Sequence, residues 1–297
     1  MSNFFLANEA LLNLCMINAF LALSQYIVLR AGVFSLASAG LAAIGAYAAA
    51  GVILRHNAHP ALAIGFASIL GMASATILAI PLARLRGVFQ AIATLAFVQI
   101  VMSIALYAES ITGGATGLNG IPKSVESWHL LIILVGVTYF FAKLGASPTG
   151  RAFDTIRQDE TVAVSLGIDV VRHHAIAFAL SGLVAGIAGG LMAAHNYSVA
   201  NGEFGFGMMI AVLSFVVLGG RQSVAGPIVG ASFLTLLPHV ARPLADNRMI
   251  IYGALLVTAI VYLPHGIVDT LLLHRRRRQQ SSRSIDKLDD PSARAGI

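Results

Sequence analysis

The chain is a succession of apolar runs, each close to the length of one bilayer crossing. A helix needs about 20 predominantly apolar residues to cross the hydrocarbon core. Of the 297 residues, 57% are hydrophobic and only 11% are charged, whereas a soluble domain carries roughly a quarter charged residues to hydrate its surface. We therefore predict an all-α, polytopic integral membrane helical bundle of about 8 to 10 transmembrane helices. The candidate spans are 8–29, 33–54, 61–83, 88–107, 129–146, 174–194, 206–220, 225–240 and 249–264.

Basic residues predict the orientation of the bundle. Arg275, Arg276, Arg277 and Arg278 follow the last apolar run, and such clusters are retained on the cytoplasmic side. Nine spans then place the N-terminus outside and the C-terminus in the cytoplasm. We expect residues 1–274 to form the transmembrane domain and residues 275–297 to form a basic, disordered cytoplasmic tail. The assignment places Arg30, Arg84, Arg86, the loop 147–173 and Arg221 inside, and Arg55, Lys123, Arg242 and Arg248 outside.

The net charge of +6 is explained largely by this tail cluster. A basic cluster beside a final span serves membrane retention and contacts anionic headgroups. We therefore expect the lipid bilayer, and no nucleic acid, as a partner of the charged residues.

Several spans contain small or uncharged polar residues. Glycines at 182, 186, 189 and 190 recur at spacings of three and four, which is typical of helices that pack closely. Ser35, Ser38, Thr94 and Gln99 lie within apolar spans, where such groups either bond across helices or face a wet pathway. Both readings stay open, so these four residues are candidates for the substrate path. No acidic or basic residue lies clearly at mid-span, which argues against proton coupling.

The loop 108–128 is predicted to lie outside. Its glycines, threonines and asparagine predict a flexible, hydrogen-bonding segment and no helix. It either simply connects two spans or lines the entrance of a substrate path, for which Thr112, Gly113, Gly114 and Thr116 are candidates. Within this loop the stretch from Gly117 to Ser124 ends in Pro122, Lys123 and Ser124, a near miss to a phosphate-binding loop. Proline in place of the required glycine removes a backbone donor, so we expect no ATP site in this chain.

The loop 148–172 is predicted to lie inside and to be partly helical. Nothing between Arg151 and Leu166 breaks a helix, and Phe153, Ile156, Ala163 and Val164 fall near one face. Gly167 follows where a helix C-terminus favours left-handed geometry. Such a short amphipathic helix either docks into a groove of a soluble partner or lies on the membrane interface.

Catalytic chemistry finds no support in the sequence. The adjacent His173 and His174 point to different faces, and neither a His-Glu-x-x-His motif nor a Gly-x-Ser-x-Gly elbow occurs. We expect no catalytic residue, no metal site and no cofactor bound by this chain.

Three stretches resemble the branched-chain amino acid permease family of ABC transporters, and its M-type more than its H-type subunit. They are ITGGATGL at 111–118, AFALSGLVAGIAGGL at 177–191 and VVLGGRQSVAGP at 216–227, together with the loop carrying Glu160, Ala163 and Gly167. Each is weak alone, but their order extends from about Gly32 to Asp269. Thr161 departs from the family pattern, which often has a second small residue after the glutamate.

The resemblance implies a transport subunit without its own ATPase site, in the bacterial inner membrane. It would import branched-chain amino acids or related small amino acids and amides, with a second homologous permease subunit and a periplasmic binding protein. Two cytoplasmic ABC ATPases would bind ATP-Mg and drive it. The coupling contact would fall on the loop 148–172, at Arg151, Asp154, Arg157, Glu160, Ala163 and Gly167. The alternative is a self-sufficient secondary transporter or facilitator for a small solute.

Overall fold

The computed structural model describes residues 2–123, 125–240, 253, 257 and 266–270. The long helices are α1 (Ser2–Arg30), α2 (Ser38–His56), α3 (Pro60–Leu82), α4 (Val88–Tyr107), α6 (Ser127–Ala146), α9 (Val170–His195), α10 (Phe206–Gly219) and α11 (Ala225–Val240). The short elements are α5 (Glu109–Thr112), η1 (Gly114–Thr116), β1 (Leu118–Asn119), α7 (Pro148–Gln158), α8 (Glu160–Ser165), β2 (Ser198–Val199) and η2 (Asn201–Phe204).

The described chain is a helical membrane bundle, as the sequence predicts. Seven described helices are long and apolar enough to cross a membrane. The predicted span 225–240 forms α11, whose apolar part, Ala225–Leu237, is shorter than the others. The predicted span 249–264 and the predicted tail 275–297 lie outside the described residues, apart from positions 253 and 257. The all-α, polytopic prediction is thereby confirmed.

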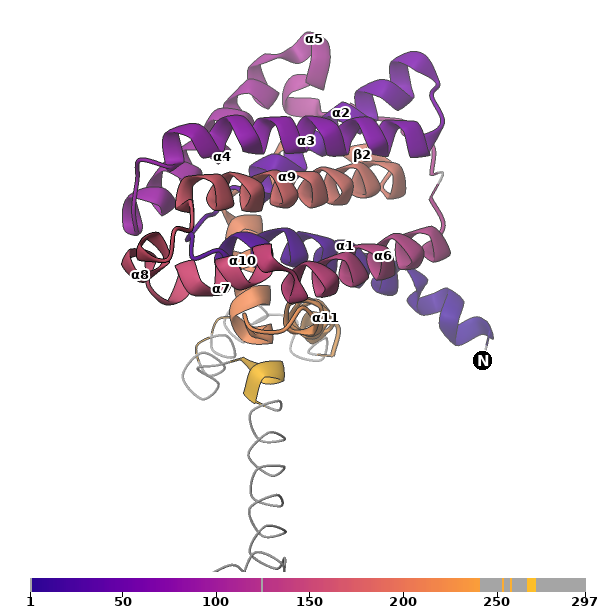
Figure 1. Cartoon of the computed structure of the whole chain (residues 1–297). Coiled ribbons are helices and arrows are strands. Elements are labelled where there is room, and N and C mark those ends of the chain that lie inside the picture. The colour runs from indigo at the N-terminus through magenta and orange to yellow at the C-terminus, as the bar shows by residue number, and fades with distance from the viewer. Residues whose placement is uncertain (1, 124, 241–252, 254–256, 258–265, 271–297) are drawn as a thin grey trace, which may run out of the picture.

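Helix α9 is the centre of the bundle and packs against α1, α2 and α3 (Figure 1). The predicted close packing of its glycines is confirmed. A Cβ added at Gly182 would overlap the Gly71 carbonyl oxygen on α3, and one at Gly189 would overlap the Ala42 carbonyl oxygen on α2. Because no side chain separates the helices there, their backbones approach within van der Waals contact.

The outer helices of the described bundle leave much apolar surface uncovered. In α4 and α6 only 22% and 17% of the most apolar window is buried, compared with 61% in α9. Large side chains such as Ile92, Ile100 and Ile132 are more than half exposed. Such a surface is stable only against lipid or another membrane subunit.

Chain connectivity separates the described charged residues between two ends of the bundle. At one end lie α7 and α8, on the left in Figure 1, with the α1–α2, α3–α4 and α10–α11 connections. This end carries Arg30, Arg84, Arg86, Arg151, Arg157, Arg172 and Arg221, whereas Arg55 and Lys123 lie at the other end. The predicted division of the loops between two sides therefore fits the fold, and which side faces the cytoplasm stays a prediction.

The described residues 266–270 return to the α7–α8 end. The Asp269 carboxylate accepts a hydrogen bond from the Gln222 backbone N–H at 2.9 Å, and Gly266 contacts the backbone of Gly219 and Gly220. The polar turn between α10 and α11 is thus held by a carboxylate from a distant part of the chain.

Candidate functional site

The first candidate site is the folded unit formed by α7 and α8. Helix α7 starts at a capping serine, Ser147, whose Oγ accepts from the Gly150 N–H at 3.3 Å, with Pro148 in the first turn. Both are favoured at helix N-termini. Ala152, Phe153 and Ile156 are buried along one face of the helix. The amphipathic spacing seen in the sequence thus produces a helix that packs onto the end of the bundle.

The prediction of one continuous helix from Arg151 to Leu166 is wrong. Asp159 has extended backbone angles (φ −158°, ψ 113°) and divides the segment into α7 and α8. Its carboxylate accepts from the N–H groups of Thr161 at 2.8 Å and Val162 at 3.2 Å. Asp is among the strongest N-caps because its side chain satisfies donors that a helix start leaves free. The break is therefore encoded by the side chain of Asp159 and not by a glycine or proline.

Helix α8 ends as predicted at Gly167, which is left-handed with φ +77°. The Ile168 N–H bonds to the Ala163 carbonyl at 3.0 Å and the Gly167 N–H to the Val164 carbonyl at 2.9 Å, a pattern that closes many helices. Ala163 is fully buried against Ile156 and Val170, so α7, α8 and α9 share a small core. Val164, predicted on the same face, instead has 58% of its surface exposed.

An ion pair between the buried Arg30 and the partly exposed Asp154 anchors α7 to α1. Arg30, only 8% exposed, donates from Nε and Nη2 to the two carboxylate oxygens of Asp154 at 3.1 and 2.8 Å. The same guanidinium donates to the Tyr26 hydroxyl at 3.2 Å and lies against Gly145. Two parallel bonds to one carboxylate fix the relative orientation of both groups. The predicted site residue Asp154 is therefore rigidly connected to the end of α1.

The other predicted residues of this unit are held less tightly. Glu160 pairs with Arg86 of the α3–α4 connection at 3.0 Å, and the Arg86 side chain is 82% exposed. Arg157 lies 3.9 Å from Asp154 and its Nε is buried without a hydrogen-bond partner. The Arg151 guanidinium donates to the Ala146 carbonyl at 3.1 Å. The unit therefore contacts α1 through a buried pair and the start of α4 through an exposed one.

The surface of the α7–α8 unit offers apolar side chains and a cleft. Val162, Val164 and Leu166 on α8 have 48%, 58% and 68% of their surface exposed. A cleft of about 540 Å³ separates α7 from the start of α9 and is lined by Arg151, Asp169, Arg172 and His173 among others. Exposed aliphatic side chains within a charged surface are typical of interaction sites.

The second candidate site is a buried polar cluster between α1, α2 and α4. The Ser38 hydroxyl donates to Gln25 Oε1 at 2.9 Å, and the Gln25 amide donates to the Ser35 carbonyl. The Thr94 hydroxyl accepts from the Leu36 N–H at 3.0 Å. The side chains of Ser38 and Thr94 thus bond between elements, the first of the two readings given above, whereas the Ser35 hydroxyl accepts from the nearby Ala37 N–H at 3.1 Å.

Two features of this cluster differ from the sequence-based picture. Gln99, predicted alongside the other three, is exposed on α4 away from them. Gln25, the residue at the centre of the network, was missed by the sequence analysis. A glutamine directly after Ser24 in an otherwise apolar run is the signal that could have revealed it.

The third candidate site is the loop predicted to line an entrance. We define the cap as residues 108–121 and 196–205, which meet at the end of the bundle opposite α7 and α8. The strand β1 pairs antiparallel with β2, with Leu118 opposite Val199, and the Ile121 N–H bonds to the Tyr197 carbonyl at 3.1 Å. The predicted flexible, non-helical loop is therefore wrong for these residues, which form α5, η1 and β1.

The four predicted residues of the cap serve mainly its own backbone. The Thr112 hydroxyl donates to the Ala105 and Ala108 carbonyls at 2.6 and 2.8 Å, and the Thr116 hydroxyl donates to the Gly113 carbonyl at 2.8 Å. Gly113 and Gly114 have φ of +74° and +59°, a region that favours glycine. The partner segment 196–205 was not recognised from the sequence. Among the described residues, no group of three or more His, Cys, Asp or Glu side chains could hold a metal.

Taken together, the fold defines a multi-pass helical membrane protein with a folded unit at one end of its bundle. Residues 8–260 match the family described as branched-chain amino acid transport system / permease component. The chain belongs to this family of membrane permease components. The resemblance predicted from the three motifs is therefore confirmed.

Individual relatives refine the comparison. The high-affinity branched-chain amino acid transport system permease protein LivM of Salmonella typhimurium is 31% identical over 277 residues, covering 80% of this chain and 64% of the relative. LivM of Escherichia coli K12 is 31% identical over 296 residues, covering 86% and 68%. The high-affinity branched-chain amino acid transport system permease protein LivH of Escherichia coli K12 is 24% identical over 164 residues, covering 54% of this chain and 51% of the relative. The chain thus spans about two thirds of the LivM length, and no solved structure matches it significantly.

Proposed function

We propose that this chain is one of two permease subunits of an ATP-driven importer in the bacterial inner membrane. Its cargo would be branched-chain amino acids or related small amino acids and amides. Two cytoplasmic ABC ATPases would bind ATP-Mg, and a periplasmic binding protein would deliver the cargo. The family membership supports the permease role, and the similarity to the LivM branched-chain amino acid permease proteins supports the cargo class.

The observation that carries the coupling part of this proposal is the construction of the α7–α8 unit. Its inner face is tied to α1 by the buried Arg30–Asp154 pair, while Val162, Val164 and Leu166 project from its surface. A short helix with exposed aliphatic side chains suits a groove on a soluble partner. We propose that α8 is inserted into an ATPase subunit, with Arg151 and Glu160 at the edge of the contact.

The same contacts supply a route for the conformational change. A displacement of the unit would move α1 through Asp154 and Arg30, and the start of α4 through Glu160 and Arg86. Gln25 lies five residues before Arg30 on α1, and Thr94 lies eight after Arg86. Both belong to the polar cluster with Ser38. We propose that closure of the ATPases acts on this cluster, which rearranges as the pathway opens.

The substrate path itself is proposed to run past the cap. Delivery by a binding protein requires a rigid docking surface at the outer end, and the paired strands β1 and β2 supply order there. The exposed Thr116 and the partly exposed Gly113 would lie on this surface, whereas Thr112 and Gly114 are buried beneath it. Gln99, exposed on α4, is the remaining candidate for contact with cargo.

An affinity purification from native membranes tests the proposal as a whole. The tagged chain is extracted gently and every co-purifying protein is identified by mass spectrometry. Two ABC ATPases and a second hydrophobic subunit are expected, and the purified complex should import leucine into liposomes only with ATP and the binding protein. Recovery of the chain alone, together with leucine uptake by that chain without ATP, would instead identify a self-sufficient transporter.

A further inference from the structure

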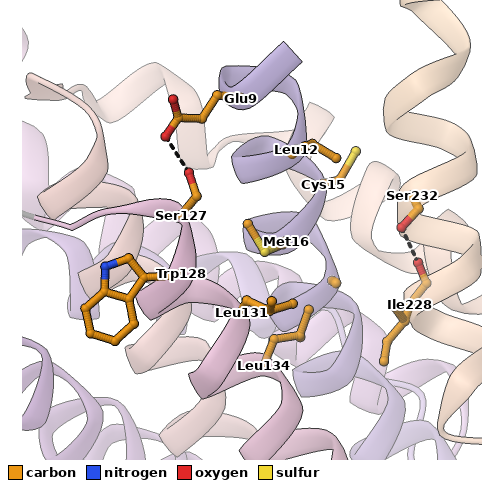
Figure 2. A pocket seen from close by; sticks show the side chains of 11 residues that line it. Glu9, Leu12, Cys15, Met16, Ser127, Trp128, Leu131, Leu134, Ile228 and Ser232 are labelled. Atoms are coloured by element: carbon orange, nitrogen blue, oxygen red, sulfur yellow. Dashed lines mark hydrogen bonds between the residues drawn. The ribbon is translucent and has the colours of Figure 1, made fainter. Parts of the chain in front are cut away.

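A membrane-facing groove lies between α1, α6 and α11, away from the three candidate sites. Its volume is about 580 Å³. Figure 2 shows α1 and α6 side by side with α11 across the opening. The lining comes from Glu9, Leu12, Cys15, Met16 and Ala19 on α1, from Ser127, Trp128, Leu131 and Leu134 on α6, and from Ile228 and Ser232 on α11.

The groove has one polar end and an apolar interior. At the polar end, the Ser127 hydroxyl donates to Glu9 Oε1 at 2.6 Å (Figure 2). The Trp128 indole N–H donates to Glu126 Oε2 at 2.7 Å. The Glu9 carboxylate therefore lines this end and the Glu126 carboxylate lies beside it, bound to Trp128, and no lysine or arginine is among the described residues that line the groove. Tryptophan is enriched where a membrane meets water, so the polar end lies at headgroup level.

The dimensions of the groove match one leaflet. Glu9 and Ala19 are ten residues apart on α1, which corresponds to about 15 Å at the rise of an α-helix. This is about half of the 30 Å hydrocarbon core. The groove thus extends from headgroup level to the middle of the bilayer, which is the path of a single acyl chain.

The walls of the groove face outward. Leu12, Trp128 and Leu131 have 46%, 53% and 53% of their surface exposed. Ser232 donates to the Ile228 carbonyl of its own helix at 2.9 Å, so its hydroxyl presents no free polar group to the interior. An apolar, concave surface at this depth suits a hydrocarbon chain better than water or a polar ligand.

We propose that the groove binds one acyl chain of a phospholipid whose headgroup carries a primary ammonium, as in phosphatidylethanolamine. The chain lies along Leu12, Met16 and Leu134, and the ammonium faces the carboxylates of Glu9 and Glu126. A primary ammonium donates hydrogen bonds to carboxylates, whereas the anionic headgroup of phosphatidylglycerol is repelled by them. The site is independent of the transport function proposed above.

The sequence makes this site directly measurable, because Trp128 is the single tryptophan of the chain. The full-length chain is reconstituted in nanodiscs in which part of the lipid carries bromine near the headgroup end of its acyl chains. Bromine quenches indole fluorescence on close contact. Brominated phosphatidylethanolamine should quench Trp128 with roughly threefold higher apparent affinity than brominated phosphatidylglycerol, the size expected of one exposed ion pair.

Three variants that keep Trp128 test the groove itself. Ser232→Phe fills the interior and should abolish the preference between the two lipids, whereas Val135→Phe, on an exposed position of α6 outside the groove, should leave it unchanged. The double variant Glu9→Gln/Glu126→Gln should also equalise the two lipids while quenching persists. Equal quenching by both lipids in the wild-type chain would overturn the headgroup assignment. Absence of quenching would overturn the lipid site itself, because it would show that protein covers the groove and excludes lipid.

Discussion

The two ends of the bundle are held by different means. At the α7–α8 end, side-chain charges make the connections, through the Arg30–Asp154 and Arg86–Glu160 pairs. At the cap end, backbone geometry does so, through left-handed glycines and strand pairing. Both ends looked like loops of comparable length in the sequence. Among the described residues, ion pairs that can open and close while the helices stay folded occur only at the α7–α8 end, since Arg55 contacts the cap at the backbone carbonyls of Ser110 and Ile111.

From this difference we propose separate mechanical roles for the two ends. The exposed Arg86–Glu160 pair is individually weak and exchanges readily with water or with a partner, whereas the Arg30–Asp154 pair keeps α7 attached to α1. The strand pairing and hydrogen-bonded turns of the cap are lost only if the backbone itself rearranges and leaves its N–H and C=O groups without partners. We therefore regard the α7–α8 unit as the part that transmits motion and the cap as a fixed wall.

The largest expected effect is the loss of the buried pair. Asp154→Asn leaves the Arg30 guanidinium buried with a neutral partner, which should lower the free energy of unfolding by about 3 kcal/mol, the lower end for a broken buried pair because Asp154 is partly exposed. Unfolding in detergent micelles with increasing dodecyl sulfate measures the change. Replacing both residues, as Arg30→Met with Asp154→Leu, should recover most of the loss, and equal stability of Asp154→Asn and wild type would contradict the anchor.

A smaller effect is expected in the cap. Gly117 has φ +67° and ψ −168°, and a Cβ there would overlap the Val199 carbonyl oxygen. Gly117→Ala should therefore cost about 2 kcal/mol, from an unfavourable backbone region and the displaced strand. The matched control is Gly202→Ala in the same cap, where a Cβ would meet nothing within 4 Å. If both variants unfold at the same denaturant fraction, the cap is not held by its backbone.

The smallest effect on stability, and a large one on function, is expected at Glu160. Its partner Arg86 is mostly exposed, so Glu160→Gln should change the free energy of unfolding by less than about 1 kcal/mol. ATP-dependent leucine uptake per assembled complex should nevertheless fall severalfold, because α8 loses its contact with the α3–α4 connection. Unchanged uptake at normal complex levels would remove Glu160 from the coupling route.

Much of the fold was predictable because a bilayer imposes simple requirements. Span length and hydropathy identified the apolar helices, and glycine spacing identified the close packing of α9. These features depend on composition over many residues. The break at Asp159 depends on one side chain in competition with helix continuation, and the sequence does not show which of the two prevails.

The candidate site was predictable only in part. Residues of the loop 148–172 do form one folded unit, but its partners Arg30 and Arg86 lie far away in the chain. Likewise, Gln25 bonds to residues 35 and 38, and Thr94 to Leu36, only after three elements have packed. Order in the cap depends on residues 196–205, which begin 68 positions beyond the end of the predicted loop 108–128. Such long-range pairings are invisible to reasoning from local pattern.

Single cysteines at the two ends test the central claim most directly. Cys15 is the only cysteine, so a Cys15→Ser background allows Val164→Cys on α8 and Thr116→Cys in the cap, both at exposed positions. Each is fitted with a short photo-crosslinker in the assembled transporter, and the products are identified by mass spectrometry. We expect position 164 to crosslink to an ABC ATPase and position 116 not to do so. Crosslinking of position 116 to an ATPase, with none from position 164, would contradict the assignment of the α7–α8 unit as the coupling site.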